Sequence, residues 1–220
     1  MRRSAPSLVL LFLGGVTLPS GGAVARIQET GNDPIKLGEC VMRMARPLAR
    51  AVALSIPGSA EENRLFAELN PTILNCKGTP PGGMSIDQKS LFMGAISSKI
   101  LAPVTVYHSG WSGRPNLDAA AQMMALQSQG YPLRSAMAKC LVFVDTNNAF
   151  RFIKSRSGSN NEKKLASALT PSLTRCVDKG VNLSMSLQAL RAETTRAFAR
   201  YVCAPNDPPA SGKVGDGKPD

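Results

Sequence analysis

Five cysteines are the residues whose type and spacing most clearly indicate chemistry. Two pairs share a separation of 36 residues and lie 100 residues apart: Cys40 with Cys76, and Cys140 with Cys176. This recurrence predicts one disulfide per pair, formed in an oxidising compartment, and leaves Cys203 as a free thiol or an intermolecular bridge. A zinc site is the alternative, but the cysteines lie far apart and the chain has one histidine. We therefore predict disulfides and no bound metal.

The single histidine, His108, limits acid–base catalysis. The sequence that it begins, His-Ser-Gly-Trp-Ser-Gly, lacks the Gly-x-Ser-x-Gly order of a nucleophile elbow. Glu61 and Glu62 are neighbours on a predicted helix, so their side chains point apart and do not form a catalytic pair. No catalytic residue and no cofactor is predicted. The enzyme hypothesis that stays open is a site between the two cysteine-bounded segments, formed by Tyr107, His108, Trp111 and Arg114.

Positive charge is the second chemical feature. The net charge of +11 falls to +9 without Arg2 and Arg3, and residues 140–203 hold ten Lys/Arg against four Asp/Glu. Such a surface fits an anionic partner, such as lipid A, an acidic glycan or phospholipid headgroups; the alternative is a solvated basic surface without a partner. Nucleic acid is not expected, because the aromatic residues do not interleave with Lys and Arg as a base-stacking surface requires.

Four residues are the candidate binding site. Trp111 and Arg114 lie in the predicted loop between the two cysteine pairs. On the last predicted helix, the apolar residues share one face and Arg196 and Arg200 fall off it, which places both arginines on a basic surface.

The cysteine pairs bound an internal repeat. Residues 40–76 align without a gap on residues 140–176, with ten identical positions. Each copy has Gly-Ser followed by Glu at the third position, at Ser59/Glu62 and at Ser159/Glu162. This is the pattern of a capping box, in which the hydroxyl accepts from the Glu amide and the carboxylate accepts from the Ser amide. Leucines at i, i+4 spacing follow and predict a buried helix face: Leu65, Leu69, Leu165 and Leu169.

Helices are the elements that must position these residues. Helices are predicted over 47–55 and 147–155, after Ser59 and Ser159, and after Ser85 and Ser186. The prolines at 71 and 171 predict that the middle helix stops there and that a further short helix begins. Around Cys40 and Cys140 we expect helix, with strand as the alternative, because β-branched residues occur in both segments. Between the copies, residues 104–107 are a candidate extended piece, and helix is predicted over 117–129 and from Pro132 towards Cys140.

The N-terminus is predicted to be an export signal. Arg2 and Arg3 precede an apolar run over residues 8–13, and small residues end at Ala25, where cleavage is expected. A retained membrane anchor is the alternative, but the run is shorter than the roughly 20 residues that a spanning helix needs. We therefore expect a periplasmic or secreted protein without a transmembrane span.

The order Cys, Gly-Ser-x-x-Glu, Leu-x-x-x-Leu-x-Pro and Cys, with Arg191 further on, resembles uncharacterised secreted helical-repeat proteins of Gram-negative bacteria. The resemblance covers residues 40–100 and 140–201, and it implies export and a helical repeat without implying an activity. It departs at the last helix of the first copy, where no arginine matches Arg191.

Together these patterns predict an all-α protein of two tandem disulfide-bounded repeats, with three to four helices each, related by pseudo-symmetry. The predicted domains are residues 1–25 (signal peptide), 26–103 (first repeat), 104–139 (connecting loop and helix), 140–203 (second repeat) and 204–220 (disordered tail). The expected function is binding of an envelope component or another protein. An enzyme with a site between the two cysteine-bounded segments and a structural envelope protein are the alternatives.

Overall fold

A computed structural model describes residues 33–76, 81–105, 125–177 and 184–203 of the chain. Within these ranges the regular structure is helical and includes no strand, which confirms the predicted all-α class. The elements are α1 (Pro34–Met44), α2 (Arg46–Leu54), α3 (Ala60–Asn75), the short 3-10 helix η1 (Pro81–Gly83), α4 (Ile86–Ile100), α6 (Leu133–Val144), α7 (Thr146–Lys154), α8 (Asn160–Arg175) and α9 (Leu187–Cys203). None of the described helices is long and apolar enough to cross a membrane.

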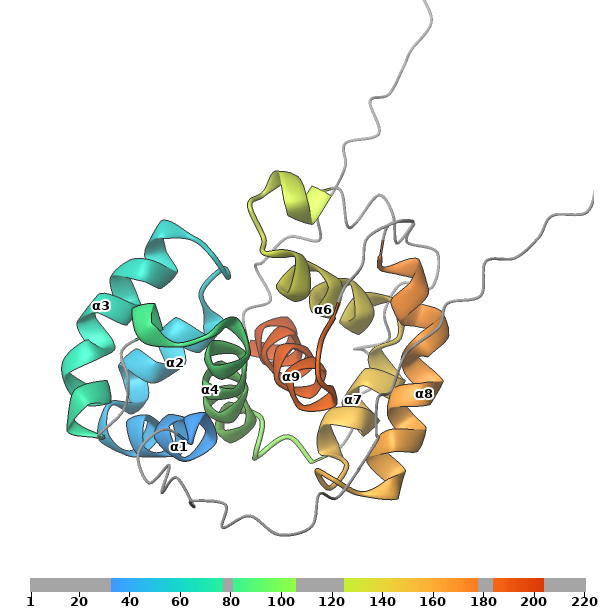
Figure 1. Cartoon of the computed structure of the whole chain (residues 1–220), viewed down its shortest axis with the longest axis horizontal. Helices are drawn as coiled ribbons and strands as arrows, with labels where there is room; N and C mark the ends of the chain where they lie inside the picture. The colour runs from blue at the N-terminus through green and yellow to red at the C-terminus, as the bar shows by residue number, and fades with distance from the viewer. Residues whose placement is uncertain (1–32, 77–80, 106–124, 178–183, 204–220) are drawn as a thin grey trace, which may run out of the picture.

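The helices form two groups that meet at a central pair. Helices α1, α2 and α3 lie on one side and α6, α7 and α8 on the other, with α4 and α9 side by side between them (Figure 1). We call α1–α4 the first unit and α6–α9 the second unit. One large apolar core extends through both units, and Phe92 of α4 and Phe198 of α9 are fully buried in it.

The contact between α4 and α9 depends on small residues. A Cβ atom added at Gly94 of α4 would lie 2.5 Å from Cβ and 2.7 Å from Cα of Ala192 on α9. Both distances are far below van der Waals contact, so only glycine allows the two helix backbones to come this close. The same device joins α1 to α4, where Gly38 faces the Phe92 carbonyl.

The predicted helix starts are confirmed, with one change in the caps. The hydroxyls of Ser59 and Ser159 each accept from the amide three residues on, at 3.1 Å in both units. The predicted hydrogen bond from the serine amide to the glutamate carboxylate is wrong by one residue. The carboxylates of Glu62 and Glu162 accept from the amides of Gly58 (2.7 Å) and Gly158 (2.6 Å), and not from the serine amides. Both glycines have positive φ, 79° and 75°, which turns their amides towards the helix.

The predicted break at the prolines is also wrong. Helices α3 and α8 continue through Pro71 and Pro171 and end one residue before Cys76 and Cys176. A proline inside a helix costs about 3 kcal/mol. In α3 this cost is offset because the next turn places Ile73, which is fully buried, on the same face as Leu69. The continued helix also carries the second cysteine of each pair to its partner.

The disulfides are formed as predicted. Cys40 is bonded to Cys76 and Cys140 to Cys176, each across 36 residues, and Cys203 is a free cysteine. Cys40 and Cys140 lie within helices α1 and α6, so helix, and not strand, is confirmed for both segments. Disulfides are typical of proteins from oxidising compartments, and these two are consistent with an extracellular or secreted protein. The predicted signal peptide and tail lie outside the described residues.

Candidate functional site

The structure divides the four predicted binding residues into two groups. Trp111 and Arg114 lie outside the described residues, as do Tyr107 and His108 of the alternative enzyme site. Arg196 and Arg200 are described, and each is only 5 % exposed. The prediction that these two arginines form a basic surface is therefore wrong.

The physical reason is that the first unit covers that face of α9. Nε of Arg196 donates to the Ala53 carbonyl at 3.3 Å and Nη2 to the Val52 carbonyl at 3.4 Å. Nη1 of Arg200 donates to the Ser55 carbonyl. These carbonyls belong to the C-terminal turn of α2, where a helix leaves backbone acceptors without intrahelical partners. The two arginines are thus a C-terminal cap that one unit supplies to the other.

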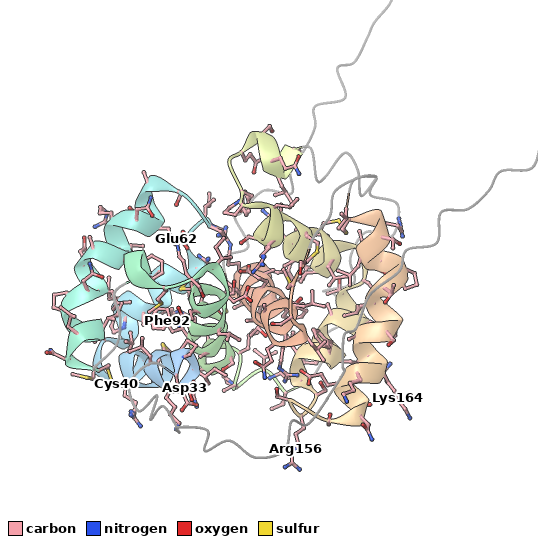
Figure 2. The ribbon with its side chains drawn as sticks, in the orientation of Figure 1. Asp33, Cys40, Glu62, Phe92, Arg156 and Lys164 are labelled. Carbon is pink, nitrogen blue, oxygen red and sulfur yellow. A yellow bond between two sulfur atoms is a disulfide. The ribbon has the colours of Figure 1, made fainter. Side chains whose placement is uncertain are left out.

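Arg196 also neutralises a buried carboxylate. Its Nη2 lies 2.7 Å from Oε1 of Glu62, whose side chain is 1 % exposed. Nζ of Lys89 lies 3.5 Å from the other carboxylate oxygen. Burial raises the pKa of Glu62, but Arg196, the Gly58 amide and Lys89 together outweigh it and hold the pKa below its ordinary value of 4.5. Glu62 is therefore a buried anion, enclosed between α3, α4 and α9 (Figure 2).

The second unit contains the same arrangement with a different arginine. Glu162 is 2 % exposed, and its Oε1 lies 2.9 Å from Nη1 of Arg191. The guanidinium of Arg191 also donates to the carbonyls of Phe152 (3.1 Å) and Ile153 (2.7 Å), which end α7. The guanidinium of Arg191 thus forms an ion pair with the buried Glu162 and caps the C-terminal end of α7. Arg196 does the same for Glu62 and α2 in the first unit.

The two arginines do not come from equivalent positions. With the one-residue insertion between the copies, Arg191 corresponds to Ser90 of α4. Ser90 instead donates to the buried carboxylate of Glu193 at 2.5 Å. The sequence shows that the first unit has no arginine at the position of Arg191. It does not show that Arg196 takes that role, because Arg196 lies 134 positions after Glu62 in the chain.

A second buried polar cluster lies beside Arg200. The Tyr131 hydroxyl accepts from Nη2 of Arg200 at 3.1 Å and from Nζ of Lys139 at 3.2 Å. Both cations also lie over the tyrosine ring, at 5.7 Å and 4.8 Å from its centre. Lys139 and Tyr131 are 8 % and 5 % exposed, so these groups serve packing between α6 and α9 and offer no open surface.

One group of exposed positive charges among the described residues lies where α7 turns into α8. Arg151 lies in the last turn of α7, Arg156 in the connection, and Lys163 and Lys164 at the start of α8; all four are exposed. We call these four residues the basic turn. None of them makes an ion pair with another described residue, and the one carboxylate between them, Glu162, is buried and paired with Arg191. Arg156 and Lys164 project outward from the same end of the second unit (Figure 2).

The corresponding turn of the first unit is not basic. The positions equivalent to the basic turn hold Ala51, Ile56, Asn63 and Arg64. Arg64, the one cation, has an ion pair with Glu61 at 2.7 Å and a second with Glu68. The two units therefore share a buried glutamate–arginine pair but differ in the charge of this surface.

Comparisons of the chain with protein families, with curated proteins and with solved structures found no match. In the part of the chain that the structure describes, no group of three or more His, Cys, Asp or Glu side chains is placed to hold a metal ion. The buried charged groups already contact helix ends, each other or buried hydroxyl groups. The basic turn carries exposed cations that none of these contacts engages, so it is the surface that we consider for binding.

Proposed function

We propose that this chain is an exported binding module made of two duplicated helical units, and that it binds an anionic component of the bacterial envelope through the basic turn. The observation that carries the proposal is the set of four exposed cations, Arg151, Arg156, Lys163 and Lys164, without an exposed carboxylate between them. Unpaired charges of one sign attract an anionic surface and raise the rate of encounter with it.

The position of one of these charges supports a role other than stability. Lys163 lies in the first turn of α8, where the helix dipole disfavours positive charge by about 0.3–1 kcal/mol at low salt. No ion pair with another described residue offsets this cost. A charge that opposes the helix dipole and has no partner among the described residues is one that we expect a ligand to use.

Three features support duplication and export. Helices α2 and α7, and α3 and α8, have bounds that differ by 100 residues, and each middle helix begins at the same Ser–Glu cap. Each unit also holds one disulfide and one buried glutamate paired with an arginine. The N-terminal sequence predicts export, and both disulfides fit the oxidising compartment to which an exported chain would go.

The test is binding to vesicles that contain phosphatidylglycerol, compared with vesicles of phosphatidylcholine alone. We expect binding to the anionic vesicles only, with an affinity that falls steeply as salt rises from about 50 to about 200 mM, because the Debye length shortens over this range. An acidic polysaccharide in solution, added as competitor, distinguishes a glycan from a lipid as the source of the negative charge.

The decisive variant replaces all four residues of the basic turn with glutamine. Its matched control replaces four exposed cations of the first unit, Lys36, Arg43, Arg46 and Arg50, and so removes the same net charge. We expect the basic-turn variant to lose binding at least ~10-fold, with stability unchanged or slightly raised. An equal loss of affinity in both variants would mean that net charge alone explains binding, and would contradict the proposal. Binding that is insensitive to salt would also contradict it.

A further inference from the structure

The two disulfides have the same spacing but different surroundings. Both close loops of 36 residues and join the helix containing the first cysteine to the end of the next long helix. Cys140 and Cys176 are each 0 % exposed, within a cluster that includes Leu126 and Met137. Cys40 and Cys76 are both partly exposed.

The side chain that covers the first disulfide is itself exposed. The Met44 thioether lies 3.8 Å from Sγ of Cys40 and 3.5 Å from Sγ of Cys76. Met44 is 57 % exposed, and an unbranched thioether side chain with three rotatable bonds moves aside easily. The second unit has Val144 at the equivalent position and buries its disulfide beneath core residues instead.

We infer that Cys40–Cys76 is a thiol–disulfide exchange site, open to dithiols while the protein stays folded, and that Cys140–Cys176 is not. Exchange requires a thiolate to approach one sulfur in line with the S–S bond, so access controls the rate. The partly exposed sulfurs of the first unit allow this approach after a side-chain movement. The sulfurs of the second unit become accessible only when the core around them opens.

The exchange transfers two electrons from the dithiol to the protein. A thiolate of the dithiol attacks Sγ of Cys40 or Cys76, the protein S–S bond breaks, and a mixed disulfide forms while the other cysteine leaves as a thiolate. The second thiol of the reagent then displaces the bound cysteine and closes the reagent's own disulfide. The two protons released by the dithiol balance the two cysteine thiolates, and the product is a protein with the first bridge open and the second intact.

The sequence provides an internal control for this inference. Because both loops contain the same number of residues, the two bridges restrict the unfolded chain equally, and their reduction rates should converge once the chain is unfolded. Any difference measured in the native protein then reports the folded surroundings of the sulfurs.

The experiment is timed reduction of the full chain with dithiothreitol. Cys203 is first blocked with one maleimide, and thiols that appear later are trapped with a second maleimide and located by peptide mass spectrometry. We expect Cys40 and Cys76 to be labelled at least ~10-fold faster than Cys140 and Cys176 in the native protein. In concentrated guanidinium chloride we expect both pairs to react at the same rate. Equal rates in the native protein, or earlier labelling of Cys140 and Cys176, would overturn the inference.

Discussion

Replacement of Arg196 by methionine is the sharpest test of the buried arrangement between the units. Methionine keeps the unbranched apolar stem of the side chain but is shorter and lacks the guanidinium. The carboxylate of Glu62, 1 % exposed, then loses the cation at 2.7 Å and keeps Lys89 at 3.5 Å and the Gly58 amide at 2.7 Å. The Ala53 carbonyl loses its donor, whereas the Val52 carbonyl keeps the Ser55 hydroxyl at 2.7 Å.

The expected magnitude follows from these contacts. Removing one partner of a buried ion pair costs about 3–5 kcal/mol, chiefly because the remaining charge is left without compensation. Lys89 offsets part of that loss, so we expect Arg196→Met to lower the free energy of unfolding by about 3 kcal/mol, the lower end of this range. The double variant Glu62→Gln with Arg196→Met removes the orphaned charge. It should therefore cost less than the sum of the single changes, with a coupling of about 1–3 kcal/mol.

The assay is urea unfolding followed by circular dichroism, with Arg64→Met as the matched control. Arg64 also pairs with glutamates, but it lies on the surface of α3, where solvent screens the ion pair. We expect no measurable change in the unfolding midpoint of that control. If Arg196→Met were as mild as Arg64→Met, the claim that α9 completes the first unit would be refuted.

Two further predictions concern acid and the central helix contact. The pKa of Glu62 is lowered in the folded chain, so its contribution to stability is present above pH 4.5 and is lost as the pH falls through the folded value. Thermal unfolding should show a smaller decline of the melting temperature below pH 4.5 for Glu62→Gln than for the wild type, and equal slopes would contradict this origin. Gly94→Ala should destabilise the chain by about 1–3 kcal/mol, because the added carbon meets the backbone of Ala192. Gly82→Ala, where nothing lies within 4 Å, is the control in the same urea assay, and equal effects of the two changes would count against the close contact.

Local chemistry in the sequence was enough to predict much of the fold. The equal cysteine spacing predicted both disulfides, and the Ser–Glu pattern predicted the starts of α3 and α8, because each depends on residues close together or on a repeated distance. The helix break at Pro71 failed because the rule is local. The energy that carries α3 past this proline comes from burying Ile73 against other helices and from delivering Cys76 to Cys40. Neither contribution is visible in the residues that flank the proline.

The candidate site was predicted less well, for a related reason. Helical periodicity placed Arg196 and Arg200 off the predicted apolar face of α9, but it could not show that the first unit covers both arginines. The four cations of the basic turn were among the ten Lys and Arg residues counted over residues 140–203. To identify them, one had to know that Glu162, between Arg156 and Lys163, is buried and already paired with Arg191.

The contrast between the two units indicates where function should be sought. If the units arose by duplication, as we propose, the buried glutamate has kept a guanidinium in both, although Arg191 serves one unit and Arg196 the other. The physical requirement, a cation for a buried carboxylate and donors for a helix end, has thus been met by two different routes. Such a requirement is imposed by the fold, so these buried charges do not distinguish what the protein binds. The basic turn is under no such requirement: in the first unit the equivalent positions hold one cation, which is ion-paired, and one charge of the basic turn opposes the helix dipole. The difference between the units, and not their likeness, therefore points to the binding surface.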